Sequence, residues 1–573
     1  MSRTGPESTP ATSGPPGRDA PPRLTDYAAE RRAFRLDVPE RFNPVLGIVE
    51  AWARDAPDDL ALLSLDAAGE VVGRQTIADV ARESRRAARA LLELGLGPGD
   101  PVFIMLPRIP AWYPAILGAI RIGAIPMPAP NILTPRDIAY RLERGEAVAA
   151  VTDRDGAAKV DAIDPRPAGV RHRLCVTGGG SPPEGWASFE QVLDDAGDGD
   201  TPADPTSRED PMLLYFTSGT VSYPKMVVHT AAYGLGHLGT ARYWHDLRPG
   251  DLHWTVTDTG WAKAAWGSLF GQWNERAAIV QVNLGRPDAD AILSLLARHR
   301  ITSFCAPPTL YRMLVQADVR AYDLSGLRHC TSAGEPLNAE VLRVWSDGTG
   351  LTVYDGYGQT ETTCLVANFR AVPVRPGSMG KPVPGYDVEI MTADGVPAAA
   401  GEVGDVAVRA EPRPVGLFRG YHRDPAATAA RFRDGWYYTG DRASRDEDGY
   451  FWFEGRDDDI ITSSAYRIGP FEVESALIEH PAVVETGVVG KPDPQRTEIV
   501  CAFVILADDC APTPQLARDL QDHTKELTAP YKYPRVIHFV RELPKTVSGK
   551  IRRTELREWA RDGVPAGLER DEA

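Results

Sequence analysis

Apolar residues recur along most of this chain at the spacings that helices and buried strands require. Apolar positions three and four residues apart predict helices, and short continuous apolar runs predict buried strands. In the first part these patterns predict, in order, a helix over Pro44–Ala56, a strand over Ala61–Leu65, a helix over Ile77–Leu94, a strand over Val102–Leu106, a helix over Trp112–Ile122 and a strand over Ala124–Pro128. The same alternation returns at Ala277–Val282, Ala289–His299 and Ser303–Ala306. Alternating strands and helices with short connections favour parallel α/β layers.

The pattern changes near residue 455, where the charged segment Arg456–Asp459 interrupts it. The segments predicted beyond it are a helix over Pro470–His480, strands over Val483–Val489 and Val500–Leu506, a helix over Pro514–Thr528 and a strand over Val536–Val540. We therefore expect an α/β protein with a large N-terminal domain of layered α/β subdomains over residues 28–457. A small C-terminal α+β domain is expected over residues 458–573, with the boundary at Asp458.

Composition narrows the class of protein. The chain has 63 basic and 79 acidic residues and a net charge of −16, and such an acidic surface disfavours nucleic-acid binding. No apolar run reaches the ~18 residues of a membrane helix, and no apolar signal segment is visible near the N-terminus. The cysteines form no Cys-x-x-Cys pair, which favours reduced thiols in a cytoplasmic protein. Residues 1–27 are rich in Pro, Ser, Thr and Gly, and we expect a disordered leader there.

A loop of small hydroxyl residues follows the apolar run Leu213–Phe216. Its residues with side chains or backbone suited to phosphate are Thr217, Ser218, Gly219, Thr220 and Lys225. Small hydroxyl residues around a glycine expose backbone N–H and side-chain O–H donors, and a lysine adds positive charge, so the loop suits a triphosphate. The spacing is not that of a Walker A loop, and a polar surface turn would have the same composition.

Two further clusters suit a nucleotide. The first consists of Asp355, Gly356, Tyr357, Gly358, Gln359, Thr360 and Glu361. Its glycines let the backbone approach a ligand, Tyr357 offers a ring for stacking a purine, and Glu361 suits Mg²⁺. The second is the segment Gly435–Asp441 with Arg456 downstream. Asp441 is suited to accept hydrogen bonds from ribose hydroxyls, and Arg456 to add a hydroxyl or phosphate contact. Each cluster alone is also explained as a glycine-rich turn.

A basic segment, Pro544–Arg553, lies near the C-terminus. Such runs are usually solvated surface. Here Gly549 precedes Lys550, which also fits a mobile loop that presents Lys550 to an anion.

The four clusters in this order resemble the adenylate-forming superfamily, which includes acyl-CoA synthetases, luciferases and the adenylation domains of peptide synthetases. The resemblance covers residues 30–560 approximately. The segments that look most like the medium-chain acyl-CoA synthetase branch are Phe304–Thr309, Arg328–Asn338 and Tyr466–Glu474. It implies an enzyme that activates a small carboxylic acid with ATP and Mg²⁺ as acyl-AMP, releases pyrophosphate, and transfers the acyl group to CoA.

The resemblance also implies roles for residues. Lys550, Glu361 and Thr217 would be catalytic, with Glu361 on Mg²⁺ and Lys550 bridging the acid carboxylate and the α-phosphate. The remaining ATP or AMP contacts would be Ser218, Gly219, Thr220, Lys225, Gly334, Glu335, Pro336, Asp355, Gly356, Tyr357, Gly358, Gln359, Thr360, Asp441, Arg456 and Arg467. The acid would lie near Trp261 and Gly356. The small domain would rotate between the two steps about a hinge at Asp458.

The chain departs from the family pattern at three positions. Val221 and Ser222 replace a hydroxyl residue and a glycine of the phosphate loop, and Ala465 replaces a glycine that would lie against the CoA channel. Two alternatives therefore stay open. One is a relative that passes the activated group to another nucleophile, such as a diazotase of secondary metabolism that activates nitrite for transfer to an aromatic amine. The other is an AMP-sensing module, against which the retention of Lys550, Glu361 and Asp441 argues. The oligomeric state is not predicted.

Overall fold

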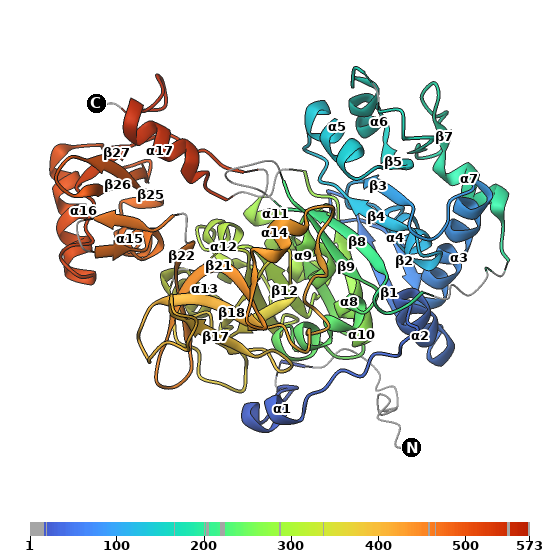
Figure 1. Cartoon of the computed structure of the whole chain (residues 1–573), viewed down its shortest axis with the longest axis horizontal. Helices are drawn as coiled ribbons and strands as arrows, with labels where there is room; N and C mark the ends of the chain where they lie inside the picture. Colours follow the sequence, from blue (N-terminus) through green and yellow to red (C-terminus); the bar gives the residue numbers. More distant parts are fainter. Residues whose placement is uncertain are drawn as a thin grey trace.

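A computed structural model gives the structure of the protein and describes residues 17–18, 20–165, 167–199, 201, 206–217, 224–285, 288–335, 337, 339–456, 459–463, 466–546 and 550–570. Within these residues the strands form five sheets with helices packed around them. In Figure 1 the C-terminal part, coloured orange-red to red, stands beside the larger body that the rest of the chain forms. No helix of the described ranges is both long and apolar enough to span a bilayer.

The largest sheet has the strand order β16-β15-β14-β13-β12-β10-β11-β1-β2. Its strands are β1 (Leu60–Leu65), β2 (Val71–Thr76), β10 (Leu252–Thr255), β11 (Ala278–Val282), β12 (Ser303–Ala306), β13 (His329–Ala333), β14 (Val353–Gly358), β15 (Cys364–Ala367) and β16 (Lys381–Pro382). The strands from β14 to β1 pair in parallel, and β2, β15 and β16 are antiparallel to their neighbours. The carboxyl ends of the parallel strands therefore meet at one edge, where ligands bind in such sheets.

The other sheets are smaller. A parallel sheet, β4-β3-β5-β6-β7, contains β3 (Pro101–Met105), β4 (Ile125–Pro128), β5 (Ala149–Asp153), β6 (His172–Val176) and β7 (Ala187–Ser188). An antiparallel sheet, β19-β9-β8, contains β8 (Pro211–Phe216), β9 (Met226–Thr230) and β19 (Gly420–Tyr421). A further antiparallel sheet contains β17 (Val388–Met391), β18 (Gly404–Arg409), β20 (Phe432–Arg433), β21 (Trp436–Arg445) and β22 (Phe451–Arg456). The C-terminal sheet contains β23 (Ile461–Ser463), β24 (Tyr466–Ile468), β25 (Val483–Asp493), β26 (Thr497–Leu506) and β27 (Val536–Phe539).

Helices cover these sheets. The α-helices are α1 (Tyr27–Ala33), α2 (Glu50–Asp55), α3 (Ile77–Glu93), α4 (Trp112–Arg121), α5 (Pro135–Arg144), α6 (Arg154–Asp161), α7 (Phe189–Ala196), α8 (Tyr233–Gly236), α9 (Ala262–Gly267), α10 (Phe270–Asn274), α11 (Ala289–Arg298), α12 (Pro308–Leu314), α13 (Ala339–Thr349), α14 (Pro425–Ala429), α15 (Pro470–Ile478), α16 (Pro514–Leu527) and α17 (Arg553–Asp562). The π-helical turns η1 (Val45–Val49) and η2 (Thr240–Trp244) and the 3-10 turn η3 (Val319–Ala321) complete the set.

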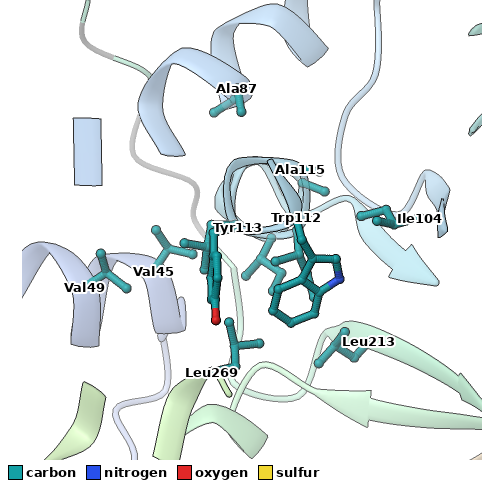
Figure 2. Packing of buried hydrophobic residues seen from close by; sticks show 14 of the residues in the cluster. Val45, Val49, Ala87, Ile104, Trp112, Tyr113, Ala115, Leu213 and Leu269 are labelled. Atoms are coloured by element: carbon teal, nitrogen blue, oxygen red, sulfur yellow. The ribbon is translucent and has the colours of Figure 1, made fainter. Parts of the chain in front are cut away.

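The helix α4 lies at the centre of the largest apolar core. Every residue of this helix is buried, as expected for a helix that is apolar on all sides. Figure 2 shows Trp112 and Tyr113 pointing from α4 toward Leu213 of β8 and toward Leu269, with Val45 of η1 on the other side. This packing fixes the hairpin of β8 and β9 against the body.

The predicted elements are confirmed in type, and their ends agree within a few residues. The first predicted helix begins as the π-helical turn η1 before it continues as α2. In the C-terminal part α15 buries Val473, Ala476 and Leu477 on one face, as the spacing predicts. The predicted domain boundary at Asp458 lies outside the described residues, between the end of β22 and the start of β23.

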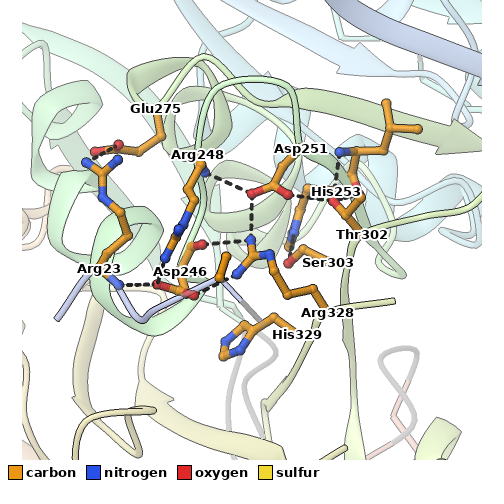
Figure 3. Close-up of polar contacts among 12 residues, drawn as sticks. Arg23, Asp246, Arg248, Asp251, His253, Glu275, Thr302, Ser303, Arg328 and His329 are labelled. Atoms are coloured by element: carbon orange, nitrogen blue, oxygen red, sulfur yellow. Dashed lines mark hydrogen bonds and ion pairs between the residues drawn. The ribbon is translucent and has the colours of Figure 1, made fainter. Parts of the chain in front are cut away.

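The prediction of a disordered leader is wrong for residues 20–27, because this segment is held on the body. Leu24 is 1% exposed, and the backbone N–H of Arg23 donates to Asp246 at 2.6 Å. Figure 3 shows Arg23 reaching both Asp246 and Glu275, beside the buried guanidinium of Arg328. The prediction rested on the average composition of 27 residues, and such an average does not detect the few side chains, such as Leu24, that contact the core. Residues 1–16 lie outside the described residues.

Candidate active site

A cleft of about 520 Å³ runs between the carboxyl edge of the largest sheet, the sheet of β21 and the C-terminal part of the chain. This volume lies within the range of small-molecule sites. The predicted site residues that line it are Thr217, Lys225, Gly334, Glu335, Asp355, Gly356, Tyr357, Gly358, Gln359, Thr360, Glu361, Asp441, Arg456 and Lys550. Segments more than 300 residues apart in sequence thus meet in one place.

The hairpin of β8 and β9 brings two predicted phosphate-binding residues to the cleft. The backbone N–H of Thr217 donates to the carbonyl of Lys225 at 2.9 Å, and the N–H of Lys225 donates to Thr217 Oγ1 at 3.1 Å. These two bonds fix the ends of the intervening loop. Ser218, Gly219 and Thr220, like Val221 and Ser222, lie outside the described residues.

Glycines of β14 form the floor of the cleft because aromatic rings lie directly beneath them. A Cβ on Gly356 would lie 2.5 Å from the ring of Trp244, and one on Gly358 would lie 2.5 Å from the ring of Trp266. Only glycine lets the backbone rest on these rings. Asp355, at the edge of this floor, is buried, and burial raises its pKa to about 8. Its carboxyl group is therefore mostly protonated at neutral pH.

Asp441 is the centre of a hydrogen-bonded group in the wall opposite. Its Oδ2 accepts from the hydroxyl of Tyr357 at 2.6 Å and from the amide of Gln359 at 2.6 Å, and its Oδ1 lies 4.0 Å from Arg456 Nε. Gln359 is itself held by the hydroxyl of Tyr437 at 2.9 Å. Burial raises the pKa of Asp441, and Arg456 and the two donors oppose that rise. The arrangement orients one carboxylate oxygen toward the cleft and fixes the other.

Glu361 is a buried carboxylate at the same end of the cleft as Lys225. Its Oε1 accepts from the hydroxyl of Tyr421 at 2.8 Å, and burial raises its pKa while this hydrogen bond opposes the rise. The carbonyl of the preceding residue, Thr360, accepts from Nε2 of His229 at 2.7 Å. Burial lowers the pKa of His229 to about 4, so the ring is neutral and Nε2 carries the hydrogen. Tyr421 and His229 were not predicted from the sequence.

The C-terminal part of the chain contributes Lys550 to the cleft. The residue is open to solvent on one side, and desolvation by the surrounding protein lowers the pKa of its ammonium group, an effect that Glu335, Asp441 and Glu361 oppose. The helix α17, which follows it, is anchored by Arg553, whose Nη2 pairs with Glu474 Oε1 at 2.5 Å. The lysine therefore lies three residues before an anchored helix and lines the same cleft as Asp441 and Glu361.

The remaining predicted residues are not part of this cleft as described. Trp261 does not line it and stands immediately before α9 at the N-cap position. The ring under the floor is that of Trp266, at the other end of α9. Arg467 lies on β24, and only its backbone is described. Pro336, Asp458 and Ala465 fall outside the described residues. The roles assigned to the residues within the cleft stay predictions.

Two protein-family models match the chain. A family model described as "AMP-binding enzyme" matches residues 49–422, and one described as "AMP-binding enzyme C-terminal domain" matches residues 472–550. The chain is 43% identical over 551 residues to the mitochondrial acyl-coenzyme A synthetase ACSM3 of Mus musculus, covering 94% of each chain.

Two solved structures are similar along nearly the whole chain. The anthranilate CoA ligase AuaEII, in complex with anthranoyl-AMP, is similar with a TM-score of 0.84 and 30% identity, covering 92% of this chain and 98% of that one. The benzoate CoA ligase from Burkholderia xenovorans LB400 is similar with a TM-score of 0.79 and 30% identity, covering 90% of this chain and 100% of that one.

Proposed function

This chain belongs to the AMP-binding enzyme family, and we propose from that premise that it is an AMP-forming acid–CoA ligase. Its substrate is a small carboxylic acid, medium-chain or aromatic. A carboxylate oxygen attacks the α-phosphorus of ATP, giving acyl-AMP and pyrophosphate. The sulfur of CoA then attacks the acyl carbonyl carbon, AMP leaves with the bonding electrons, and the thiol proton passes to solvent. The products are the acyl-CoA thioester and AMP.

One observation carries the proposal: Lys225 and Lys550, from two different parts of the chain, line the same cleft as Asp441 and Glu361. The first step brings a carboxylate to a triphosphate, so two anions must approach. Fixed cations that offset this repulsion supply most of the catalysis in such reactions. In the proposal Lys225 and Thr217 hold the outer phosphates. Lys550 neutralises the charge that develops between the acid carboxylate and the α-phosphate.

The nucleoside half of ATP fits the wall around Asp441. The carboxylate oxygen that is not bonded to Tyr357 and Gln359 is available to accept from ribose hydroxyls. Arg456 lies beside it. The glycine floor at Gly356 gives a flat surface for the adenine and for the acyl group.

The residues present also fit a magnesium ion that arrives with ATP. Among the described residues there is no group of three or more acidic or histidine side chains that would form a complete metal cage. Mg²⁺ does not need one, because it keeps water and substrate phosphate ligands and binds through one or two carboxylates. Glu361 would supply that carboxylate, and the ion would neutralise phosphate charge during the first step.

The surface of the C-terminal part supports CoA as the acceptor. Tyr466, whose side chain is exposed, stacks on Tyr531 with ring centroids 4.0 Å apart. The neighbouring ring of Tyr533 has Lys525 Nζ at 4.4 Å and the guanidinium of Arg535 at 4.8 Å. Tyr531 and Tyr533 are half-buried. One exposed and two half-buried aromatic rings with adjacent cations suit a molecule that combines a purine with phosphates. The diazotase alternative has no comparable observation in its favour.

The acceptor is decided by one comparison of assays. The protein is incubated with ATP, a panel of aliphatic and aromatic acids, and CoA, and AMP formation is measured. The assay is repeated with nitrite and an aminobenzoate in place of acid and CoA. We expect AMP formation that requires both an acid and CoA. AMP formation that requires nitrite and is indifferent to CoA would reject the proposed acceptor.

The first step is tested through Lys550. Lys550→Ala is expected to lower acid-dependent pyrophosphate release by several orders of magnitude, with little change in ATP affinity, because the lysine acts on charge that develops in the transition state. The matched control is Lys545→Ala, which removes a lysine of the same segment whose Nζ pairs with Glu485 at 2.8 Å. Equal release by the two variants would reject the role of Lys550.

A further inference from the structure

Tyr421 contacts two predicted site residues of the cleft at once, the catalytic candidate Glu361 and the ATP-binding candidate Lys225. It is 7% exposed and lines the cleft. Its hydroxyl donates to Glu361 Oε1 at 2.8 Å, and the Nζ of Lys225 lies 4.8 Å from the centre of its ring. One side chain therefore stands between the carboxylate suited to Mg²⁺ and the cation suited to the outer phosphates.

The backbone around Tyr421 is fixed on both sides of the site. Tyr421 lies on β19, which pairs with β9 as the third strand of that sheet. In this pairing Tyr421 is opposite Val227. The flanking backbone bonds are Phe418 N–H to Glu361 O at 2.8 Å, Arg419 N–H to Val228 O at 2.8 Å and His422 N–H to Met226 O at 2.8 Å. The segment therefore ties the hairpin of the phosphate loop to the turn that carries Glu361.

We propose that Tyr421 is a positioning residue of the first half-reaction: its hydroxyl orients the Glu361 carboxylate and its ring places the Lys225 ammonium, so that one side chain sets the spacing of the two groups. The inference rests on the proposed function for the identity of the ligand, MgATP. It adds a residue whose own atoms need not touch the reacting centre.

The chemistry of the two contacts predicts two separable effects. Burial and the adjacent Glu361 raise the pKa of Tyr421, so the phenol stays protonated and always donates. With Oε1 occupied by that donor, the rest of the carboxylate is left to face the cleft. Aromatic rings attract ammonium groups through their negative faces. Loss of the hydroxyl should therefore weaken the metal-dependent part of ATP binding, and loss of the ring should weaken the metal-independent part as well.

The experiment measures ATP binding by isothermal titration calorimetry without any acid substrate, once in EDTA and once in excess Mg²⁺. Tyr421→Phe removes the hydroxyl and keeps the ring. Its ATP affinity in EDTA should stay near that of the wild type, while the gain in affinity on adding Mg²⁺ should shrink on the order of 10-fold. Tyr421→Leu should also lower the affinity in EDTA, by about 3-fold.

A matched control is Tyr450→Phe. Tyr450 is also buried, its hydroxyl donates to the carbonyl of Pro373 at 2.7 Å, and Lys381 Nζ lies 4.5 Å from its ring. It is not among the described residues that line the cleft. Both affinities of this variant should equal those of the wild type. A Tyr421→Phe variant that matches the Tyr450→Phe control in both conditions would overturn the proposal.

A double-mutant cycle shows whether Tyr421 acts through Glu361. If it does, Tyr421→Phe in a Glu361→Gln background causes no further loss of the Mg²⁺-dependent gain. A full additional loss in that background would mean that the hydroxyl acts elsewhere and would also overturn the proposal. Because acid turnover is not measured, failure of the acid–CoA ligase function would appear in the earlier assays and not here.

Discussion

The buried guanidinium of Arg328 offers a test of what holds the large domain together. Its side chain is fully buried, and so are those of its partners Asp246 and Asp251. Its Nη1 lies 2.6 Å from Asp246 Oδ2 and its Nη2 lies 2.6 Å from Asp251 Oδ2, with a further bond to the carbonyl of Asp246 at 2.9 Å. Arg328→Met removes the central cation and leaves both carboxylates without it. Breaking a buried pair in this way costs about 3–5 kcal/mol of unfolding free energy.

The pH dependence gives the sign of the effect. Burial opposes ionisation of both carboxyls, yet neighbouring cations hold the pKa of Asp246 below its ordinary value, whereas the pKa of Asp251 is raised by burial. Without Arg328 both folded-state pKa values rise. A group whose folded pKa lies above its unfolded pKa loses stability as pH rises between the two. The cost of Arg328→Met is therefore expected to be larger at about pH 8 than at about pH 5.

Urea unfolding followed by tryptophan fluorescence measures this cost, because Trp559 is the sole tryptophan after residue 458 and the signal comes mainly from the large domain. The matched control is Arg343→Met. Arg343 pairs with Glu340 and Asp347 on the exposed face of α13, with 61% of its side chain exposed, and its loss should leave unfolding unchanged. An Arg328→Met variant as stable as this control, or one whose cost is the same at both pH values, would refute the reasoning.

Three further predictions concern the cleft. Gly356→Ala places a Cβ 2.5 Å from the ring of Trp244 and should lower thermal stability by about 1–3 kcal/mol, together with ATP affinity; a variant with wild-type melting and binding would show that the ring can yield. Asp441→Asn should weaken ATP binding on the order of 10-fold and reduce the preference for ATP over 2′-deoxy-ATP in competition titrations, and an unchanged preference would argue against ribose binding. Asp355→Asn should gain stability relative to the wild type as pH rises from about 5 to about 8, because burial raises the pKa of Asp355 to about 8; parallel urea-unfolding curves over that range would contradict this.

The sequence predicted the elements well because their apolar periods are clear. The helix α4 and the strand β3 end within one residue of the predicted positions because a helix apolar at nearly every position and a short apolar run have few other solutions. The order of strands in the nine-stranded sheet was not predictable. The two stretches of alternating strands and helices, over residues 44–128 and 277–306, have the same pattern. The sequence of a buried parallel strand does not indicate which strand it pairs with.

Some residues of the candidate site were likewise predictable from the sequence, and others were not. Glu361 and Asp441 stand in glycine-containing clusters and Lys550 in a basic segment, which mark them in sequence, and the structure places all three in one cleft. Tyr421 and His229 were missed because each acts over a long separation: Tyr421 lies 60 residues from Glu361, and His229 lies 131 residues from Thr360. No spacing rule connects such pairs, and only the strand pairing brings them together.

The pairing of β19 with β9 has a consequence for how the protein is made. Gly420 and Tyr421 complete a sheet whose other strands, β8 and β9, leave the ribosome almost two hundred residues earlier. Until then the hairpin has an unpaired edge, and such edges invite pairing with other chains. We expect nascent chains that stop before Gly420 to be prone to aggregation and to depend on chaperones. A chain that extends past Tyr421 closes the sheet and protects that edge.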